Sequence, residues 1–203
     1  MFITFEGLDS SGKTTQANLL VDDCRRTGKE VVFLREPGGT EVSERIRDIL
    51  LDREQITLSA KTELLLFSAA RAQLVQQVIL PELGAGRIVI CDRFYDSTTA
   101  YQGYGRGLDL TEVLTLNRIA TSGKQPDLTF FVDVELHEIH RRRQASGAVA
   151  DRMESAGEQF YRRVLNGYQA IATSEPGRVV IVNGMRDKEE IHKDIWHIVA
   201  QKF

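Results

Sequence analysis

Cysteine is scarce in this chain of 203 residues, which contains only Cys24 and Cys91. The two stand far apart, so their spacing indicates neither a disulfide framework nor a metal site, and we expect both to be reduced. Proline is also scarce, with 4 residues, and no tract rich in proline or glycine is long enough to separate domains. We therefore expect a single domain over residues 1–203.

Long apolar runs are missing as well, since none approaches the ~18 residues that a membrane-spanning helix needs. Met1 leads directly into a strand-like segment, without the basic and apolar residues of a targeting leader. The formal net charge of -3 gives no general attraction to nucleic acid or to a membrane. These absences predict a cytoplasmic protein with neither of those partners, and the 42% of hydrophobic residues is sufficient for a sizeable core.

Apolar runs rich in β-branched residues alternate with segments of helical spacing. The runs predict strands at 1–5, 30–34, 87–91, 128–132 and 178–182. The spacing predicts helices at 13–27, 41–52, 59–80, 111–121, 135–144, 157–173 and 187–202. The sequence therefore predicts an α/β fold, in which helices flank a five-stranded parallel sheet as a three-layer α/β/α sandwich. Ligands of such folds bind at the carboxyl ends of the strands.

The most informative segment matches the phosphate-binding loop G-x-x-x-x-G-K-[ST] and stands between a predicted strand and a predicted helix. Its residues, here called the P-loop, are Gly7, Leu8, Asp9, Ser10, Ser11, Gly12, Lys13 and Thr14. The glycines allow backbone N–H groups to surround phosphates, Lys13 can reach the β- and γ-phosphates, and the Thr14 hydroxyl can hold Mg²⁺. The motif predicts a site for nucleotide phosphates in a P-loop NTPase fold, and the family resemblance described below implies that this nucleotide is ATP. The alternative is an ordinary glycine-rich turn.

Charged residues follow the second and third predicted strands. Arg35 begins a loop shaped by proline and two glycines, where it could meet a phosphate or pair with Glu36 or Glu41. Asp92 is placed to hold magnesium, directly or through water. Arg93 offers a planar fork that binds a phosphate through two hydrogen bonds and neutralises charge during transfer. The alternative is a structural ion pair between Asp92 and Arg93.

Phe67 and Arg71 lie four residues apart on a predicted helix, so their side chains share one face. The ring could stack on a planar heterocycle while the guanidinium binds its edge. Without other information, the simpler interpretation is a core aromatic residue with a solvated arginine above it.

A basic helix end, Arg141-Arg142-Arg143, leads into a loop of small residues and then Asp151-Arg152. This pattern is typical of a mobile lid over about residues 141–155, which closes over nucleotide and brings arginines to the transferring phosphoryl group. The alternative is a solvated helix end favoured by the helix dipole. It holds for at least one of the three arginines, because consecutive helical residues point to different sides.

Together these residues resemble the thymidylate kinase family, which passes the γ-phosphoryl group of ATP to deoxythymidine monophosphate (dTMP). The matching segments follow family order over nearly the whole chain: the P-loop, 35–40, Phe67 with Arg71, Asp92 with Arg93, 97–103 and 151–154. The resemblance implies a dTMP kinase, a phosphotransferase that makes dTDP and ADP in dTTP synthesis. It also implies Mg²⁺ as the cofactor and a homodimer.

The resemblance implies site residues as well. Those for dTMP are Asp9, Arg35, Phe67, Arg71, Arg93, Thr98, Tyr101 and Gln102, with Phe67 stacked on thymine and Tyr101 crowding the sugar 2′ position. Those for catalysis are Lys13, Arg93, Arg143 and Arg152, and those for the metal are Thr14 and Asp92. Some family members carry an arginine where this chain has Ser10 and Ser11, so the lid must supply that charge, from Arg143 and Arg152 ahead of Arg142. Residues 183–186 are expected near the adenine ring.

Two alternatives stay open. One is another nucleoside or nucleotide kinase on the same scaffold, which Phe67, Arg71 and Tyr101 disfavour. The other is a nucleotide-dependent switch protein that phosphorylates no acceptor. The guanine-reading segment N-K-x-D does not follow the later predicted strands, and this disfavours a guanine-binding switch.

Overall fold

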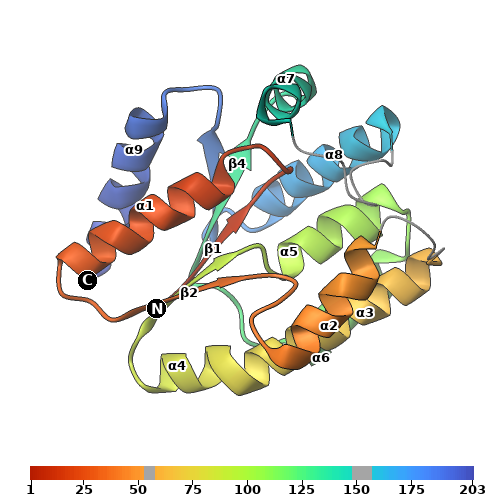
Figure 1. The fold of residues 1–203 in the computed structure, drawn as a ribbon, viewed down its shortest axis with the longest axis horizontal. Helices are drawn as coiled ribbons and strands as arrows, with labels where there is room; N and C mark the ends of the chain where they lie inside the picture. The colour runs from red at the N-terminus through yellow and green to blue at the C-terminus, as the bar shows by residue number, and fades with distance from the viewer. Residues whose placement is uncertain (53–57, 148–156) are drawn as a thin grey trace.

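The computed structural model describes residues 1–52, 58–147 and 157–203. One parallel sheet is formed by β1 (Phe2–Glu6), β2 (Val31–Arg35), β3 (Ile88–Asp92), β4 (Leu128–Asp133) and β5 (Val179–Asn183), in the order β2-β3-β1-β4-β5. Helices lie on both sides of this sheet (Figure 1). The five predicted strands and the three-layer arrangement are therefore confirmed, with strand ends displaced by about one residue.

Two sets of helices cover the sheet. On one face lie α1 (Lys13–Arg26) and α9 (Lys188–Ala200), which pack against each other (Figure 1). On the other face lie α3 (Ala60–Leu74), α4 (Leu80–Gly84) and α8 (Glu158–Ser174). Two helices, α2 (Glu41–Leu51) and α6 (Leu110–Ala120), pack on α3, and α7 (Leu136–Ser146) follows β4.

Side-chain caps explain where several helices begin. Thr40 accepts a hydrogen bond from the Ser43 N–H at the start of α2, and Ser59 accepts one from the Thr62 N–H at the start of α3. Asp109 caps α6 in the same way. Each cap satisfies an N–H group that has no partner inside its helix, and so sets the boundary.

The predicted helix 59–80 differs from the structure. It continues to Gly84, and a π-helical stretch, η1 (Val75–Ile79), joins α3 to α4. By length and composition, Ala60–Gly84 is apolar enough to cross a membrane. In the fold this segment packs on α2, α6 and β3, and it carries the buried charged residues Glu63 and Arg71. It is therefore a helix of the folded domain, with one side packed inward and the other exposed.

Two elements between β3 and α6 were not predicted: α5 (Tyr95–Thr98) and the π-helical η2 (Thr99–Gly105). Close packing explains the glycines in η2. A Cβ on Gly105 would lie 2.6 Å from the ring of Phe160 on α8, and one on Gly103 would lie 2.7 Å from Leu110 on α6. Glycine thus allows η2 to approach both helices. The same glycines interrupt the apolar pattern from which a helix is predicted.

The expected state of the cysteines agrees with the structure, since Cys24 on α1 and Cys91 on β3 are both buried and free. Strand register then positions the site. Arg35 of β2 lies opposite Asp92 of β3, and Asp92 lies opposite Phe5 of β1. The carboxyl ends of the strands, and the loops that follow them, thus meet at one edge of the sheet.

Candidate active site

The P-loop has a backbone that two glycines make possible. Gly7 and Gly12 have φ values of 141° and 97°, and Ser10 has 65°. A Cβ on Gly7 would lie 2.7 Å from the carbonyl oxygen of Val132, so a larger residue does not fit. Gly12 is the N-cap of α1, which begins at Lys13. The unpaired N–H groups and the dipole of α1 therefore point at the loop, as anion binding requires.

Asp9 connects the P-loop to Arg93. Its Oδ1 accepts hydrogen bonds from Nζ of Lys13 at 3.3 Å and from Nη2 of Arg93 at 2.7 Å. Burial raises the pKa of Asp9, but the charges of Arg93 and Lys13 outweigh burial and lower the pKa below its ordinary value. A single carboxylate oxygen thus brings together the two cations that sequence reasoning assigned to catalysis.

The position of Arg93 is fixed by its backbone and its neighbours. Its φ of 71° lies in the left-handed region, which residues other than glycine adopt rarely and often at functional sites. Its guanidinium donates to Ser97 Oγ at 3.0 Å and to the hydroxyls of Tyr168 and Tyr101 at 3.3 Å each. It also lies over the Tyr101 ring, 5.2 Å from the centroid. Arg93 is therefore a preorganised fork.

Glu6 supports the same region, and sequence reasoning missed it. This fully buried carboxylate accepts hydrogen bonds from the Phe94 N–H at 2.7 Å and from the hydroxyls of Ser97 at 2.6 Å and Tyr168 at 3.0 Å. Burial, aided by repulsion from Asp96, raises the pKa of Glu6 to about 7. The available signal was an acidic residue at the end of an apolar strand, directly before the P-loop.

Thr14 and Asp92, the predicted metal ligands, lie together. The Thr14 hydroxyl donates to Oδ2 of Asp92. The other oxygen, Oδ1, is buried and has no hydrogen-bond partner in the described ranges. Hydroxyl and carboxylate oxygens are ligands that Mg²⁺ prefers, so these residues fit that ion. The alternative ion pair between Asp92 and Arg93 is wrong, because Arg93 turns to Asp9 instead.

A pocket opens beside Arg93 and is here called the acceptor pocket. Its lining residues are Asp9, Glu36, Pro37, Arg47, Leu51, Phe67, Arg71, Arg93, Phe94, Ser97, Thr98, Tyr101 and Gln102. All the residues that the sequence assigned to dTMP line this pocket except Arg35. The solvated arginine of the simpler interpretation is wrong, because Arg71 is only 2% exposed.

Three groups orient Arg71. Its Nε donates to Oε2 of Glu36 at 2.7 Å, its Nη1 to Oδ1 of Asn117 at 3.4 Å, and its Nη2 to the carbonyl oxygen of Phe94 at 3.2 Å. A guanidinium has five N–H donors, so donors remain for a ligand in the pocket. Burial raises the pKa of Glu36, while Arg71 opposes this effect.

Arg35 lies apart from the pocket lining. It donates to Oε2 of Glu44 at 3.0 Å and to the carbonyl oxygen of Pro37 at 3.2 Å. Arg35 therefore forms its ion pair with Glu44 of α2, and not with Glu36 or Glu41 as expected from the sequence. Arg47 of α2 also donates to Pro37, at 2.8 Å, and lines the pocket. Sequence reasoning missed Arg47 because its position on a surface-like helix carries no signal.

Two arginines of the expected lid, Arg142 and Arg143, lie beside the P-loop. Arg142, ranked last, donates from Nη1 to the carbonyl oxygen of Ser11 at 3.1 Å and from Nη2 to that of Gly184 at 2.8 Å. Arg143 lines a small cavity together with Asp9. Arg152 and the rest of the expected lid, residues 148–155, lie outside the described residues.

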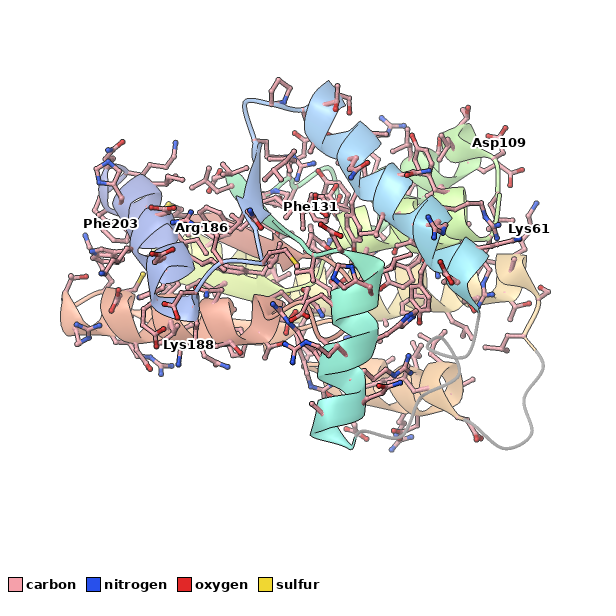
Figure 2. The ribbon with its side chains drawn as sticks, turned by 90° about the horizontal axis from the view of Figure 1, so that it is seen from above. Lys61, Asp109, Phe131, Arg186, Lys188 and Phe203 are labelled. Atoms are coloured by element: carbon pink, nitrogen blue, oxygen red, sulfur yellow. The ribbon has the colours of Figure 1, made fainter. Side chains whose placement is uncertain are left out.

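The loop after β5 lies near the P-loop, because Arg142 bonds both. Gly184 allows close packing, since a Cβ there would lie 2.5 Å from Val134. Arg186 forms an ion pair with Asp194 of α9 at 2.6 Å. Figure 2 shows Arg186 and Lys188 at the start of α9, beside α1.

The parallel sheet, the P-loop and the adjoining cation-lined pocket are together the features of a P-loop phosphotransferase. A family model described as thymidylate kinase matches residues 5–195. The chain belongs to the thymidylate kinase family. Its activity is that of the family, phosphorylation of dTMP to dTDP in dTTP biosynthesis, with ATP as the family's phosphoryl donor. The switch protein and the kinase of another base are therefore set aside.

Known proteins resemble the chain over its whole length. It is 47% identical to a thymidylate kinase of Prosthecochloris aestuarii, over 100% of this chain and 94% of that protein. It is 46% identical to a thymidylate kinase of Caldanaerobacter subterraneus subsp. tengcongensis, over 98% of this chain and 95% of that protein. A crystal structure of thymidylate kinase from Ehrlichia chaffeensis superposes with a TM-score of 0.79 at 37% identity, covering 98% of each chain.

Proposed function

We propose that ATP binds over the P-loop and dTMP in the acceptor pocket, so that their phosphates meet between Lys13 and Arg93. The observation that carries this proposal is the shared oxygen of Asp9, which lies 3.3 Å from Lys13 and 2.7 Å from Arg93. A phosphate oxygen of dTMP attacks the γ-phosphorus, the bond to the bridging β-phosphate oxygen breaks, and ADP leaves. The two cations stabilise the charge on the transferring group.

Recognition of the base falls to the far end of the pocket. Phe67 stacks on thymine, and Arg71 donates to a carbonyl oxygen of the base. Thr98 and Gln102 line the same end, and Tyr101 occupies the space that a ribose 2′-hydroxyl would need. This assignment is supported by the lining of the pocket and by the firm orientation of Arg71.

Magnesium would be held by Thr14 and Asp92, where the unpaired Oδ1 of Asp92 offers a ligand. Bound there, Mg²⁺ would neutralise phosphate charge next to Lys13.

The lid, residues 141–155, would close over ATP. We propose that Arg143 and Arg152 act on the transferring group, and that Arg142 ties the lid helix to the P-loop. The contacts of Arg142 with the carbonyl oxygens of Ser11 and Gly184 support this division.

Residues 1–203 would act as one domain, in the cytoplasm, where free buried cysteines such as Cys24 stay reduced.

A homodimer is also proposed, through α3 and α6. Leu65 on α3 and Leu114 and Ile119 on α6 are each more than half exposed, and the two helices pack together, so they offer exposed apolar side chains to a second copy. Figure 2 places Lys61 and Asp109, near the starts of the two helices, at one end of the molecule. Light scattering should give a dimer for the wild type and a monomer for Ile119→Glu. A wild-type monomer would contradict this proposal.

The experiment on function supplies purified protein with ATP, Mg²⁺ and a panel of nucleoside monophosphates, and measures each diphosphate formed. The expected result is strong preference for dTMP. The matched variant Arg71→Lys keeps the charge and removes the planar fork, so it should raise the KM for dTMP and leave the KM for ATP unchanged. An equal effect on both substrates would place the base elsewhere.

A further inference from the structure

Glu63 is a buried charged residue that no step above uses. It lies on α3 with 0% exposure. Its Oε1 accepts a hydrogen bond from Nε2 of Gln102 at 2.8 Å and one from Nε of Arg106 at 3.1 Å, and its Oε2 accepts from Nη2 of Arg106 at 3.1 Å. Arg106 in turn lies over the ring of Phe160, 4.6 Å from the centroid. The Glu63 carboxylate is therefore held in one orientation.

This carboxylate decides which way the amide of Gln102 faces. An ionised carboxylate only accepts hydrogen bonds, so the NH₂ group of the amide must turn toward Glu63. The amide oxygen is then the group left for the acceptor pocket, which Gln102 lines. Within the described ranges, the side-chain bond of Gln102 is the one to Glu63. The amide oxygen of Gln102 borders the pocket, so a ligand that displaces water from this oxygen has to offer it a donor in return.

The base end of the pocket thus has a definite polarity. Arg71 presents N–H donors, and Gln102 presents an acceptor. Thymine carries a carbonyl oxygen at position 4 and an N–H at position 3, which complement a donor and an acceptor. Cytosine carries an amino group at position 4 and an unprotonated nitrogen at position 3, so donor would face donor and acceptor would face acceptor.

We propose that Glu63 is a specificity-determining positioning residue, which fixes the amide of Gln102 with its oxygen toward the pocket and so selects pyrimidines with an N–H at position 3. The inference rests on the proposed binding of the base in the acceptor pocket. Glu63 itself does not line that pocket, and it acts through Gln102.

The test is Glu63→Gln, assayed with dTMP and dCMP. The new side chain can donate as well as accept, so the amide of Gln102 is free to turn over. We expect the ratio of kcat/KM for dTMP to that for dCMP to fall about tenfold, because thymine N3–H can lose its acceptor and the unprotonated N3 of cytosine can gain a donor. The change should come through KM, with kcat for dTMP within about twofold of the wild type. Arg106→Lys is the matched control, because it keeps both the cation and the Glu63 carboxylate, and it should keep the wild-type ratio.

A merely structural role for Glu63 would lower kcat/KM for both nucleotides equally, and an unchanged ratio overturns the inference. Gln102→Met gives the same test if Glu63→Gln folds poorly, because it removes the amide and leaves Glu63 paired with Arg106. A wild-type ratio in Gln102→Met also overturns it. Phe67→Ala separates the two proposals. If the KM for dTMP is unchanged in Phe67→Ala, the base does not bind in the pocket, and the proposal on Glu63 fails as well. If that KM rises, the base does bind there, and an unchanged nucleotide ratio in Glu63→Gln then refutes only the role of Glu63.

Discussion

The buried carboxyl of Glu6 gives a prediction about pH and stability. In Glu6→Gln the side chain keeps its shape, so its oxygen can still accept from the Phe94 N–H. The new NH₂ group can donate to the hydroxyls of Ser97 and Tyr168, which accept as well as donate. The variant should therefore fold like the wild type while lacking the titrating group.

The size of the effect follows from the pKa of Glu6, which burial raises from 4.5 to about 7. The folded protein binds this proton more tightly than the unfolded chain does. Protonation of Glu6 therefore stabilises the folded protein fully below pH 4.5, and this stabilisation is lost as the pH rises through 7. Each pKa unit corresponds to ~1.4 kcal/mol, so the free energy of unfolding should fall by about 3 kcal/mol across this window. This sign is opposite to that of an aspartate such as Asp9, whose pKa is lowered.

Urea unfolding at several pH values between 4.5 and 8 measures this loss in the wild type and in Glu6→Gln. Burial also raises the pKa of Asp96 and of Glu36, and both contribute in the same direction in the two proteins. The difference between the two curves therefore gives the contribution of Glu6 together with its repulsion from Asp96. The exposed substitution Glu41→Gln serves as a control and should parallel the wild type. Parallel curves for the wild type and Glu6→Gln would refute the reasoning.

Five further substitutions test the site. Lys13→Ala should lower kcat about 100-fold or more with an unchanged circular dichroism spectrum, because it removes a charge at the reacting phosphates, and near-normal turnover would contradict the assignment. Phe67→Ala should raise the KM for dTMP about tenfold and leave that for ATP, since stacking on a base is worth ~1–3 kcal/mol in single-strand nucleic-acid binders; an equal rise would make Phe67 a core residue. Arg142→Gln should raise the KM for ATP while Arg143→Gln lowers kcat, and the opposite result in steady-state assays would exchange their roles. Asp92→Asn should raise the Mg²⁺ concentration for half-maximal activity, and an unchanged Mg²⁺ titration would remove Asp92 from the metal site.

Parts of the fold were predictable because their signal is local. The strands are continuous apolar runs, and the glycines of the P-loop stand at fixed spacing before Lys13. By contrast, η2 was missed, because its i→i+5 bonding departs from the 3.6-residue period of an α-helix and its glycines serve packing against Phe160 and Leu110. The predicted helix 59–80 ran through η1 but stopped before Pro81, a residue that usually ends a helical pattern and that here lies in the first turn of α4.

The sequence by itself determined the class of chemistry, since phosphate binding depends on the neighbouring residues from Gly7 to Thr14, which carry the backbone path and charge together. Only the tertiary structure decided which buried side chains contact and orient the residues of the site. Glu6 meets Tyr168 across 162 positions, and Glu63 meets Gln102 across 39. Such pairs depend on strand order and helix packing, because buried carboxylates are stabilised by partners from other elements, and no local pattern encodes those partners.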